Sequence, residues 1–510
     1  MSLIFNPKLE MGLNCDARLV IYDLVKKEFI IKQLIKVNEV YELEEKVILE
    51  DPFRYKYKYQ IVENSKWVDI SKYKALLNEK ELLDFLLDKT KDINIKELVG
   101  NWKNGDSETY CSILQKTAYN FMRVFWTNKN FPFNNAYKLI EYYKVGNPID
   151  NSPFNNFILQ IKYYLLLREK FASLGLNNKS YENIYKELVQ ESKIKIELQS
   201  VLNDLEIYSE NIQMANVLKG KLESFLNQRD EAHNTFKKAL EFERDHIKVF
   251  NFDQGVYTFQ KDVKSAIEES SISYIDKVRK SETTFLISVD EKFLRFYGAS
   301  LMFTISVLKN YHFHFHIIGE PSEVLKVVED TKTLYKDICK YRGANSLYTE
   351  PTFSVENMPP YILDKKTFFA CSRYIHAEKF MIDFDCNLYI MDADLMVLSD
   401  LNDYIMSLKK FDVALPFSSG IVSLCPWRRV LAGNVFVKNN NNGKFFISQV
   451  TEYIKNNIGL PIAWTLDQNA LSYAYEQSNK NKDFKIEFGN CNKFTRPMVQ
   501  GAIRKQIEII

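Results

Sequence analysis

The chain has 510 residues, of which 46% are hydrophobic and 14% aromatic, with only 16 Gly and 13 Pro. This composition excludes a collagen-like or largely disordered protein and provides for roughly two to four folded domains. The 68 Lys and Arg residues nearly balance the 66 Asp and Glu residues, which leaves a net charge of +2 and gives no basis for predicting nucleic-acid binding.

The cysteines and the N-terminus indicate the compartment. The 7 cysteines are scattered and form no CxxC pair, which is typical of reduced structural thiols in a cytoplasmic protein. The N-terminus has no basic segment followed by an apolar core, and no uncharged apolar run approaches the ~18 residues of a membrane helix. We therefore expect neither a secretory signal nor a transmembrane segment, while peripheral contact with a membrane stays open.

Residues 1–75 are predicted to form a small β-sandwich-like domain. Short runs rich in β-branched and aromatic residues alternate there with charged turns, at 17–24, 28–37, 45–51, 55–63 and 66–70. Tyr55, Tyr57, Tyr59 and Trp67 have two interpretations, because aromatic rings stack on sugars and also fill the faces of strands. We favour strand filling.

Residues 76–275 are predicted to form an α-helical domain, since apolar residues recur there at intervals of three and four. Gly220, Ala232, Phe236 and Ala239 fall at the small and aromatic positions of one tetratricopeptide-like helix pair, without a second clear copy. Such a domain either docks a protein partner or an acceptor, or serves as scaffolding.

Residues 280–510 are predicted to form an α/β domain, so that the whole chain is multidomain α/β. Strands FLISVD (285–290), FHFHIIG (313–319) and LYIMDAD (388–394) alternate with helices, which favours a mixed, mostly parallel sheet covered on both faces. Ligands bind such sheets outside the carboxyl ends of the strands. Asp290, Asp392 and Asp394 are expected at that edge.

Asp392 and Asp394 are unusual because they follow an apolar run, where an ionised carboxylate needs a partner. Residues i and i+2 of a strand point to the same side, so both carboxylates can aim at one cation as the strand ends. Oxygen ligands suit Mn²⁺ or Mg²⁺ bound to a diphosphate. The alternative is that each Asp only caps a turn or the next helix.

Four ordered blocks lie within residues 283–475. The first block is FLISVDEKF, and the second joins CSRYIHAEKF to CNLYIMDADLMVLSDL. The third is VLAGNVFVKN, and the fourth is LDQNAL. Together these blocks resemble the GT-A fold glycosyltransferases of family 8, which are retaining enzymes similar to the bacterial lipopolysaccharide galactosyltransferases and glycogenin. In the third block the order of the small residues differs from the family's.

The resemblance implies a metal-dependent retaining hexosyltransferase that moves a sugar from a UDP-sugar donor to a glycan, lipid-linked or protein acceptor. It implies that Asp392 and Asp394 bind Mn²⁺ or Mg²⁺ and that the catalytic residues Asp467 and Gln468 lie near the anomeric carbon. The donor-binding residues that it implies are Val289, Asp290, Phe293, Arg373, Asp392, Ala393, Gly433, Asn434 and Lys493.

One departure from the family keeps other functions open. The family usually supplies a third metal ligand from a late histidine, but no histidine of this chain follows His376. FGNCNKFTRP (488–497) occupies that place, so Asn490, Cys491, Asn492 or water would substitute. A nucleotidyltransferase, which releases pyrophosphate, and a non-catalytic adaptor with a degenerate GT-A domain are the alternatives.

Three further features have competing interpretations. The histidines of HFHFH (312–316) share one face of a strand and are candidate zinc ligands, but a straight strand does not make them converge, so we favour structural histidines. Arg373 has an alternative as a surface residue paired with Asp385. For Arg428 and Arg429 we favour a solvated loop over contact with an anionic acceptor.

Overall fold

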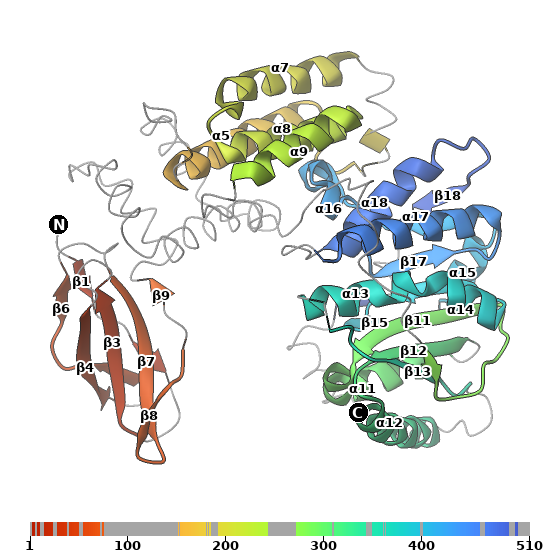
Figure 1. Cartoon of the computed structure of the whole chain (residues 1–510), viewed down its shortest axis with the longest axis horizontal. Helices are drawn as coiled ribbons and strands as arrows, with labels where there is room; N and C mark the ends of the chain where they lie inside the picture. Colours follow the sequence, from red (N-terminus) through yellow and green to blue (C-terminus); the bar gives the residue numbers. More distant parts are fainter. Residues whose placement is uncertain are drawn as a thin grey trace. The chain divides into compact units, whose positions relative to one another are not determined.

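The fold is described from a computed structural model (Figure 1). The described residues are 3–5, 8–10, 15–23, 28–37, 40–49, 55–71, 74–75, 151, 153–179, 181, 183–184, 192–242, 272–308, 311–342, 349–360, 362, 364–397, 401–459, 465–488 and 495–497. By contacts the chain divides into two units. The first comprises 1–167, 201–219 and 237–253, and the second comprises 168–200, 220–236 and 254–510.

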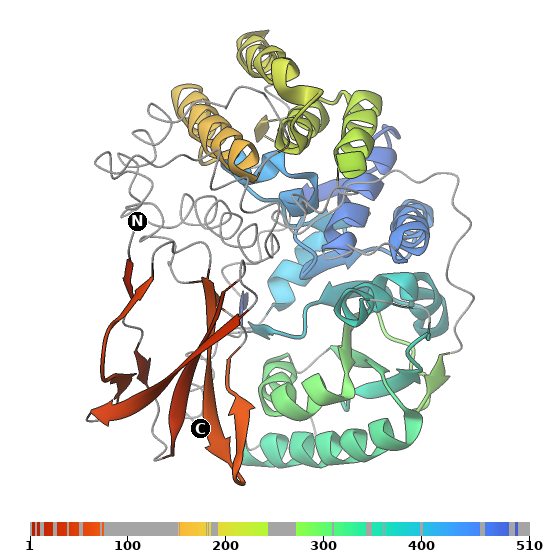
Figure 2. The same cartoon turned by 60° about the vertical axis from the view of Figure 1, so that its left-hand side comes forward.

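The N-terminal strands form an antiparallel sheet (Figure 2). Its order is β2 (Leu9–Glu10), β5 (Val40–Leu43), β4 (Glu28–Val37), β3 (Ala17–Asp23), β7 (Tyr55–Glu63) and β8 (Lys66–Asp69), and β9 (Lys74–Ala75) also pairs with β7. A separate pair, β1 (Leu3–Phe5) with β6 (Val47–Leu49), adds Val47 and Leu49 to the apolar core of this sheet. Tyr55 and Tyr59 are buried in that core, so strand filling is confirmed for both.

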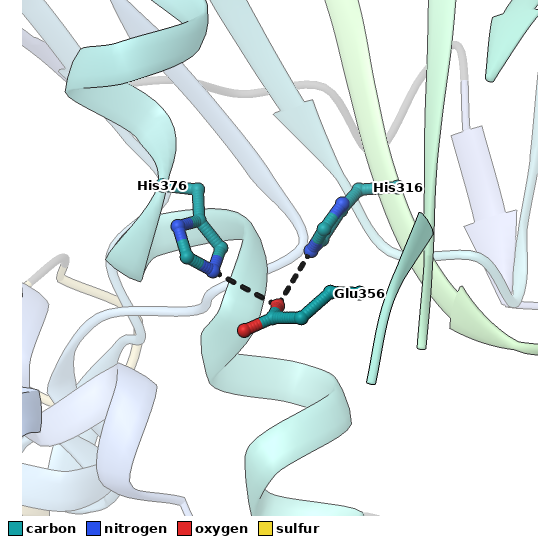
Figure 3. A group of neighbouring side chains, drawn as sticks. All are labelled: His316, Glu356 and His376. Carbon is teal, nitrogen blue, oxygen red and sulfur yellow. Dashed lines mark hydrogen bonds and ion pairs between the residues drawn. The ribbon is translucent and has the colours of Figure 1, made fainter. Parts of the chain in front are cut away.

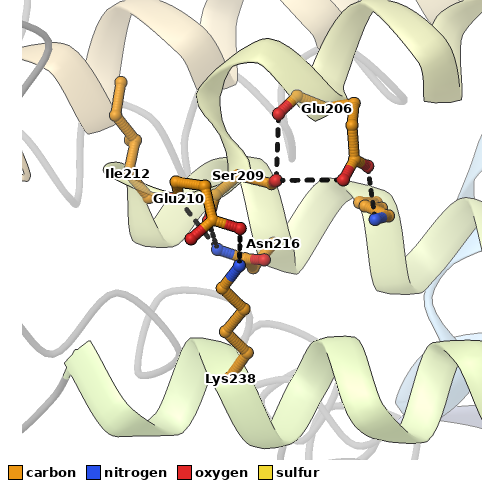
Figure 4. A network of polar contacts seen from close by, with 7 residues as sticks. Glu206, Ser209, Glu210, Ile212, Asn216 and Lys238 are labelled. Carbon is orange, nitrogen blue, oxygen red and sulfur yellow. Dashed lines mark hydrogen bonds and ion pairs between the residues drawn. The ribbon is translucent and has the colours of Figure 1, made fainter.

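The described helices of the central region are α5 (Pro153–Ser173), α7 (Ser192–Ser209), α8 (Gln213–Phe225) and α9 (Arg229–Glu241). The predicted helix pair corresponds to α8 and α9. A Cβ atom on Gly220 would lie 2.7 Å from the ring of Phe236, so this close approach requires glycine. Polar contacts join the helix ends: Asn216 Nδ2 donates to Ser209 O at 2.6 Å, and Lys238 forms an ion pair with Glu210 (Figure 4).

The C-terminal region forms a mixed 8-stranded sheet. Its order is β10 (Ser273–Tyr274), β13 (Thr352–Glu356), β12 (His312–Ile318), β11 (Thr283–Asp290), β14 (Asn387–Met391), β17 (Asn434–Val437), β16 (Val413–Leu415) and β18 (Ile486–Phe488). Strands β13, β12, β11 and β14 are parallel, whereas β17 is antiparallel to both neighbours. The carboxyl ends of the parallel strands therefore share one edge.

Helices cover both faces of this sheet (Figure 1). Helices α11 (Glu291–Val307) and α12 (Pro321–Tyr341) pack on an apolar face that includes Phe285, Phe315 and Phe353. Helices α13 (Lys365–Ile375) and α14 (Ala377–Phe384) cover the opposite face, where the rings of Phe380 and Phe384 lie against histidines of β12. The remaining elements are β15 (Leu395–Val397), α15 (Asn402–Leu408), η3 (Gly420–Leu424), α16 (Pro426–Arg429), α17 (Asn441–Asn457), α18 (Leu466–Ser478) and β19 (Thr495–Pro497).

The face beneath α13 and α14 carries a continuous series of hydrogen bonds that joins β12 to its two neighbours, β11 and β13. His312 bonds Thr284 Oγ1 at 3.0 Å and Thr352 Oγ1 at 2.8 Å. His314 lies 2.9 Å from both Thr352 Oγ1 and Ser354 Oγ. The nitrogens of His312 and His314 thus bond hydroxyl groups of β11 and β13, which agrees with the interpretation as structural histidines and not with a zinc site made by the three HFHFH histidines alone.

We expect the buried His312 to make stability depend on pH. Burial, with the nearby positive charge of Arg279, lowers the pKa of His312 from 6.5 to about 4. Between these two values the unfolded chain binds the proton and the folded chain does not, so the free energy of unfolding falls as the solution is acidified. His312 alone contributes about 3 kcal/mol to this loss. Urea unfolding at pH 7.5 and 4.5 measures it, and an equal loss in His312→Gln would contradict this assignment.

Arg429 differs from the expectation of a solvated loop. Its side chain is fully buried and pairs with Glu476 at 3.2 Å. It also donates to Ser423 O and lies over the ring of Tyr181 at 4.3 Å. Because Glu476 also pairs with Arg229 of α9, this ion-pair cluster fastens helical residues to the α/β body of the second unit.

Candidate active site

The acidic pair lies in a turn directly after β14, which ends at Met391. Asp392 N donates to Gly433 O at 3.0 Å, and Leu395 N donates to Asp392 O at 3.3 Å. We expected the two acids at positions i and i+2 of a strand, pointing to the same side. The turn instead gives them different environments. Asp392 is half-buried, whereas Asp394 is exposed on the solvent side of the turn.

Arg373 is the ion-pair partner of Asp392. This arginine is 3% exposed, forms an ion pair with Asp392 and donates to Met391 O at 3.1 Å. Its Nη2 also donates to Asp467 Oδ2 at 3.2 Å. The alternative of a surface arginine is wrong, because Asp385 pairs with Lys280 instead. Helix α13, which is capped by Asp364, thus presents Arg373 to the end of β14.

Asp467, from the fourth sequence block, joins the same cluster. It lies in the first turn of α18, is 6% exposed and accepts a hydrogen bond from Gln468 N at 2.8 Å. Burial raises the pKa of Asp467 despite the opposing effect of Arg373. Gln468 follows it and is half-buried. Arg373 therefore bridges two acids that lie far apart in the sequence.

Glycine at position 433 lets Asp392 and its neighbouring strand approach closely. A Cβ atom on Gly433 would lie 2.5 Å from Asp392 Oδ2. The next residue, Asn434, pairs with Met391 in the antiparallel register and accepts a hydrogen bond from Tyr389 at 3.2 Å. In the third block, VLAGNVFVKN, the residue next to the Asp392 carboxylate is thus a glycine, Gly433.

The first block lies at the carboxyl end of the adjacent strand, β11. Asp290 caps helix α11 and accepts a hydrogen bond from Phe293 N at 2.6 Å. Val289 is buried, and the ring of Phe293 stacks on Tyr297 at 4.3 Å. Within the described part of the chain no hydrogen bond or ion pair joins Asp290 to the Arg373 cluster. These residues share its sheet edge without direct contact.

Two predicted positions need separate mention. Ala393 lies between the two acids and packs against the apolar core. Lys493, like Asn490, Cys491 and Asn492, lies outside the described residues. Strand β19, which follows at Thr495–Pro497, pairs antiparallel with β15 just after Asp394, so the C-terminal chain runs beside the acidic turn.

The acidic turn has a donor set that suits a divalent cation. Desolvation by surrounding atoms and the carboxylate of Asp392 raise the pKa of Asp394, although its side chain is open to solvent on one side. Two repelling carboxylates are stabilised by a hard cation, and Mg²⁺ or Mn²⁺ needs few protein oxygens when water and phosphates complete its shell. The residues present therefore fit the predicted ion.

Tyr374 was not singled out in the sequence. It is buried beside Arg373 on α13, and its hydroxyl donates to Ala432 O at 2.6 Å. This bond ties the helix that carries Arg373 to the segment that carries Gly433. The only sequence signal is its place next to Arg373, since the partner is a main-chain oxygen.

No family model matches the chain. No curated protein matches it either. Solved structures that are similar include mouse xyloside xylosyltransferase 1, with 8% identity, a TM-score of 0.27 and coverage of 41% of this chain and 85% of that one. The glycosyltransferase GlyE of Streptococcus pneumoniae has 14% identity, a TM-score of 0.27 and coverage of 40% and 45%. The bifunctional glycosyltransferase WbbM has 12% identity, a TM-score of 0.28 and coverage of 52% and 51%.

The chain thus spans about half of the GlyE and WbbM chains that it matches. All three of these structures are glycosyltransferases. Because the TM-scores are low, the function is inferred below from the geometry of the site and from the four sequence blocks. None of the helices in the described ranges combines the length and the apolar character that a membrane crossing requires.

Proposed function

We propose that the chain is a metal-dependent retaining glycosyltransferase that uses a UDP-sugar donor and a GT-A-like C-terminal domain. One observation carries the proposal. Arg373 and Asp392 come from the second block of the sequence resemblance and Asp467 comes from the fourth, and the three side chains meet in one network at the carboxyl edge of a mixed sheet. Family 8 membership, the UDP-sugar donor and the cytoplasmic location are parts of this proposal.

Each side chain has a role in it. Asp392 and Asp394 would hold Mn²⁺ or Mg²⁺, which supplies Lewis-acid stabilisation of the departing diphosphate when bound. Arg373 fixes the carboxylate of Asp392 and adds a permanent positive charge beneath the turn. Gln468 and Asp467 would contact the transferred sugar near its anomeric carbon, and Asp290 with Val289 and Phe293 would receive the nucleoside.

The partners predicted from the sequence are also parts of this proposal. The acceptor would be a glycan, a lipid-linked sugar or a protein. The described helical residues within 168–200 and 220–236 belong to the same unit as the α/β body, so they are suited to brace it or to present an acceptor or protein partner.

A donor-hydrolysis experiment tests the proposal. The full chain is incubated with Mn²⁺ and a panel of UDP-sugars without an acceptor, and the released nucleotide is identified. We expect slow release of UDP from one donor or a few. Pyrophosphate release from a nucleoside triphosphate and a sugar phosphate would favour a nucleotidyltransferase, and no turnover with or without acceptors would favour an adaptor.

Replacing Gly433 by Ala is expected to reduce UDP release by at least about tenfold, because the new methyl group must displace the carboxylate of Asp392. Gly298→Ala in helix α11 is the matched control, since the nearest atom to its Cβ, Thr331 Oγ1, is 4.0 Å away. That variant should retain activity and gain up to about 1 kcal/mol of stability. Equal activity of the two variants would show that close packing at Gly433 does not matter.

A further inference from the structure

Two histidines and a glutamate form a buried cluster on the polar face of the C-terminal sheet. His316 lies on β12, Glu356 is the last residue of β13, and His376 lies at the junction of α13 and α14. Their side chains are 0%, 1% and 10% exposed. Both histidine Nε2 atoms lie 2.9 Å from the same carboxylate oxygen, Glu356 Oε2, as Figure 3 shows.

The second oxygen of Glu356 differs from the first. Glu356 Oε1 is buried, and no donor among the described residues forms a hydrogen bond with it. Within the described residues, its ion-pair partners are His316 and His376 alone, which are charged only when protonated. A buried carboxylate oxygen without a donor is costly, and a bound cation would satisfy it.

We propose that His316, Glu356 and His376 bind a Zn²⁺ ion through both Nε2 atoms and the carboxylate. Two histidines and one glutamate are a common zinc ligand set, with a fourth position for water. The three ligand atoms lie within 4.8 Å of one another. Ligands of a tetrahedral zinc ion are about 3.4 Å apart, so small side-chain movements suffice.

The surroundings of His316 supply the outer contact that zinc-bound histidines need. A histidine that binds metal through Nε2 carries its proton on Nδ1, and this proton needs an acceptor. Ser354 Oγ lies 2.9 Å from His316 Nδ1 and also 2.9 Å from His314 Nε2. Because a hydroxyl can donate and accept, Ser354 serves His316 in either tautomer and retains its bond to His314.

The position of the cluster gives the ion a structural consequence. His376 follows Arg373 by three residues at the end of the same helix, whereas His316 and Glu356 lie near the carboxyl ends of two parallel strands. A bound ion would therefore fasten the α13–α14 junction to the sheet edge that holds the candidate active site. The zinc site is separate in its ligands from the acidic pair at Asp392 and Asp394.

Metal binding by the full chain tests this proposal. The protein is stripped with a chelator and dialysed against Zn²⁺ alone, and bound metal is measured by elemental analysis together with the melting temperature. To remove the second acidic site, the measurement is repeated in the Asp392→Asn, Asp394→Asn background. We expect one tightly bound Zn²⁺ per chain in that background and a higher melting temperature with the ion.

Two ligand variants and one control decide the outcome. Glu356→Gln and His376→Gln should each weaken Zn²⁺ binding by more than about 100-fold, since even changes to residues that only support metal ligands cost 10–100-fold. His312→Gln, on the same face of β12 but outside the cluster, should retain the ion. If Glu356→Gln does not fold, the more exposed His376→Gln decides. Absence of bound Zn²⁺ in the parent chain, or unchanged binding in His376→Gln, would overturn the proposal.

Discussion

Replacing Asp394 by Asn is expected to lower metal-dependent UDP release by at least about 100-fold while the fold stays intact, because the change removes the negative charge of one of two proposed cation ligands without changing volume. Asp394 is exposed and repelled by Asp392, so the free energy of unfolding should stay within about 0.5 kcal/mol of the parent value. UDP release at several Mn²⁺ concentrations and urea unfolding measure the two effects.

The double change Asp392→Asn, Asp394→Asn should reduce the rate of UDP release by at least about 1000-fold. It should also cost stability, because Asp392 is an ion-pair partner of the buried Arg373. We expect a loss of about 1–3 kcal/mol, with Asp467 still paired to the arginine. Asp403→Asn, an exposed acid in α15, is the control for a simple loss of charge. Activity that survives the double change would remove Asp392 and Asp394 from the site.

The order of strands and helices in the C-terminal region was predictable because its signals are local. The apolar runs that contain Phe285 and Phe315 are buried strands, and the helical spacing around Arg373 is α13. The family blocks then indicated which polar residues to examine. Lys493, which the resemblance placed at the donor, lies outside the described part of the chain, so its predicted contact stays a prediction.

What sequence patterns could not supply are pairings between distant elements. The turn at Asp392 depends on main-chain bonding to Gly433, and the burial of Arg429 depends on Glu476 of another helix. Glu356 was missed although a signal exists. TFSVE (352–356) alternates polar residues with the same period as HFHFH, and in parallel register Ser354 pairs with His316.

Replacing Arg373 by Met is expected to have the largest effect on stability. It would leave two carboxylates, Asp392 and Asp467, close together with no cation between them. Breaking a buried pair by removing one partner typically costs about 3–5 kcal/mol, and we expect a loss of that size together with loss of UDP release. Arg373→Lys retains the charge but cannot contact both acids and Met391 O at once, so it should recover only part of the stability.

A double-mutant cycle separates the structural role of Arg373 from its role in the site. Adding Asp467→Asn to Arg373→Met removes one of the uncompensated charges, so stability should rise relative to the single variant. Activity should not return, because the arginine that fixes Asp392 and the carboxylate of Asp467 proposed to contact the sugar are both missing. Strictly additive losses of stability would mean that Arg373 and Asp467 do not interact in solution. Recovery of activity along with stability would mean that Arg373 only supports the fold and that the carboxylate of Asp467 is not needed, in which case neither residue has a part in the transfer reaction.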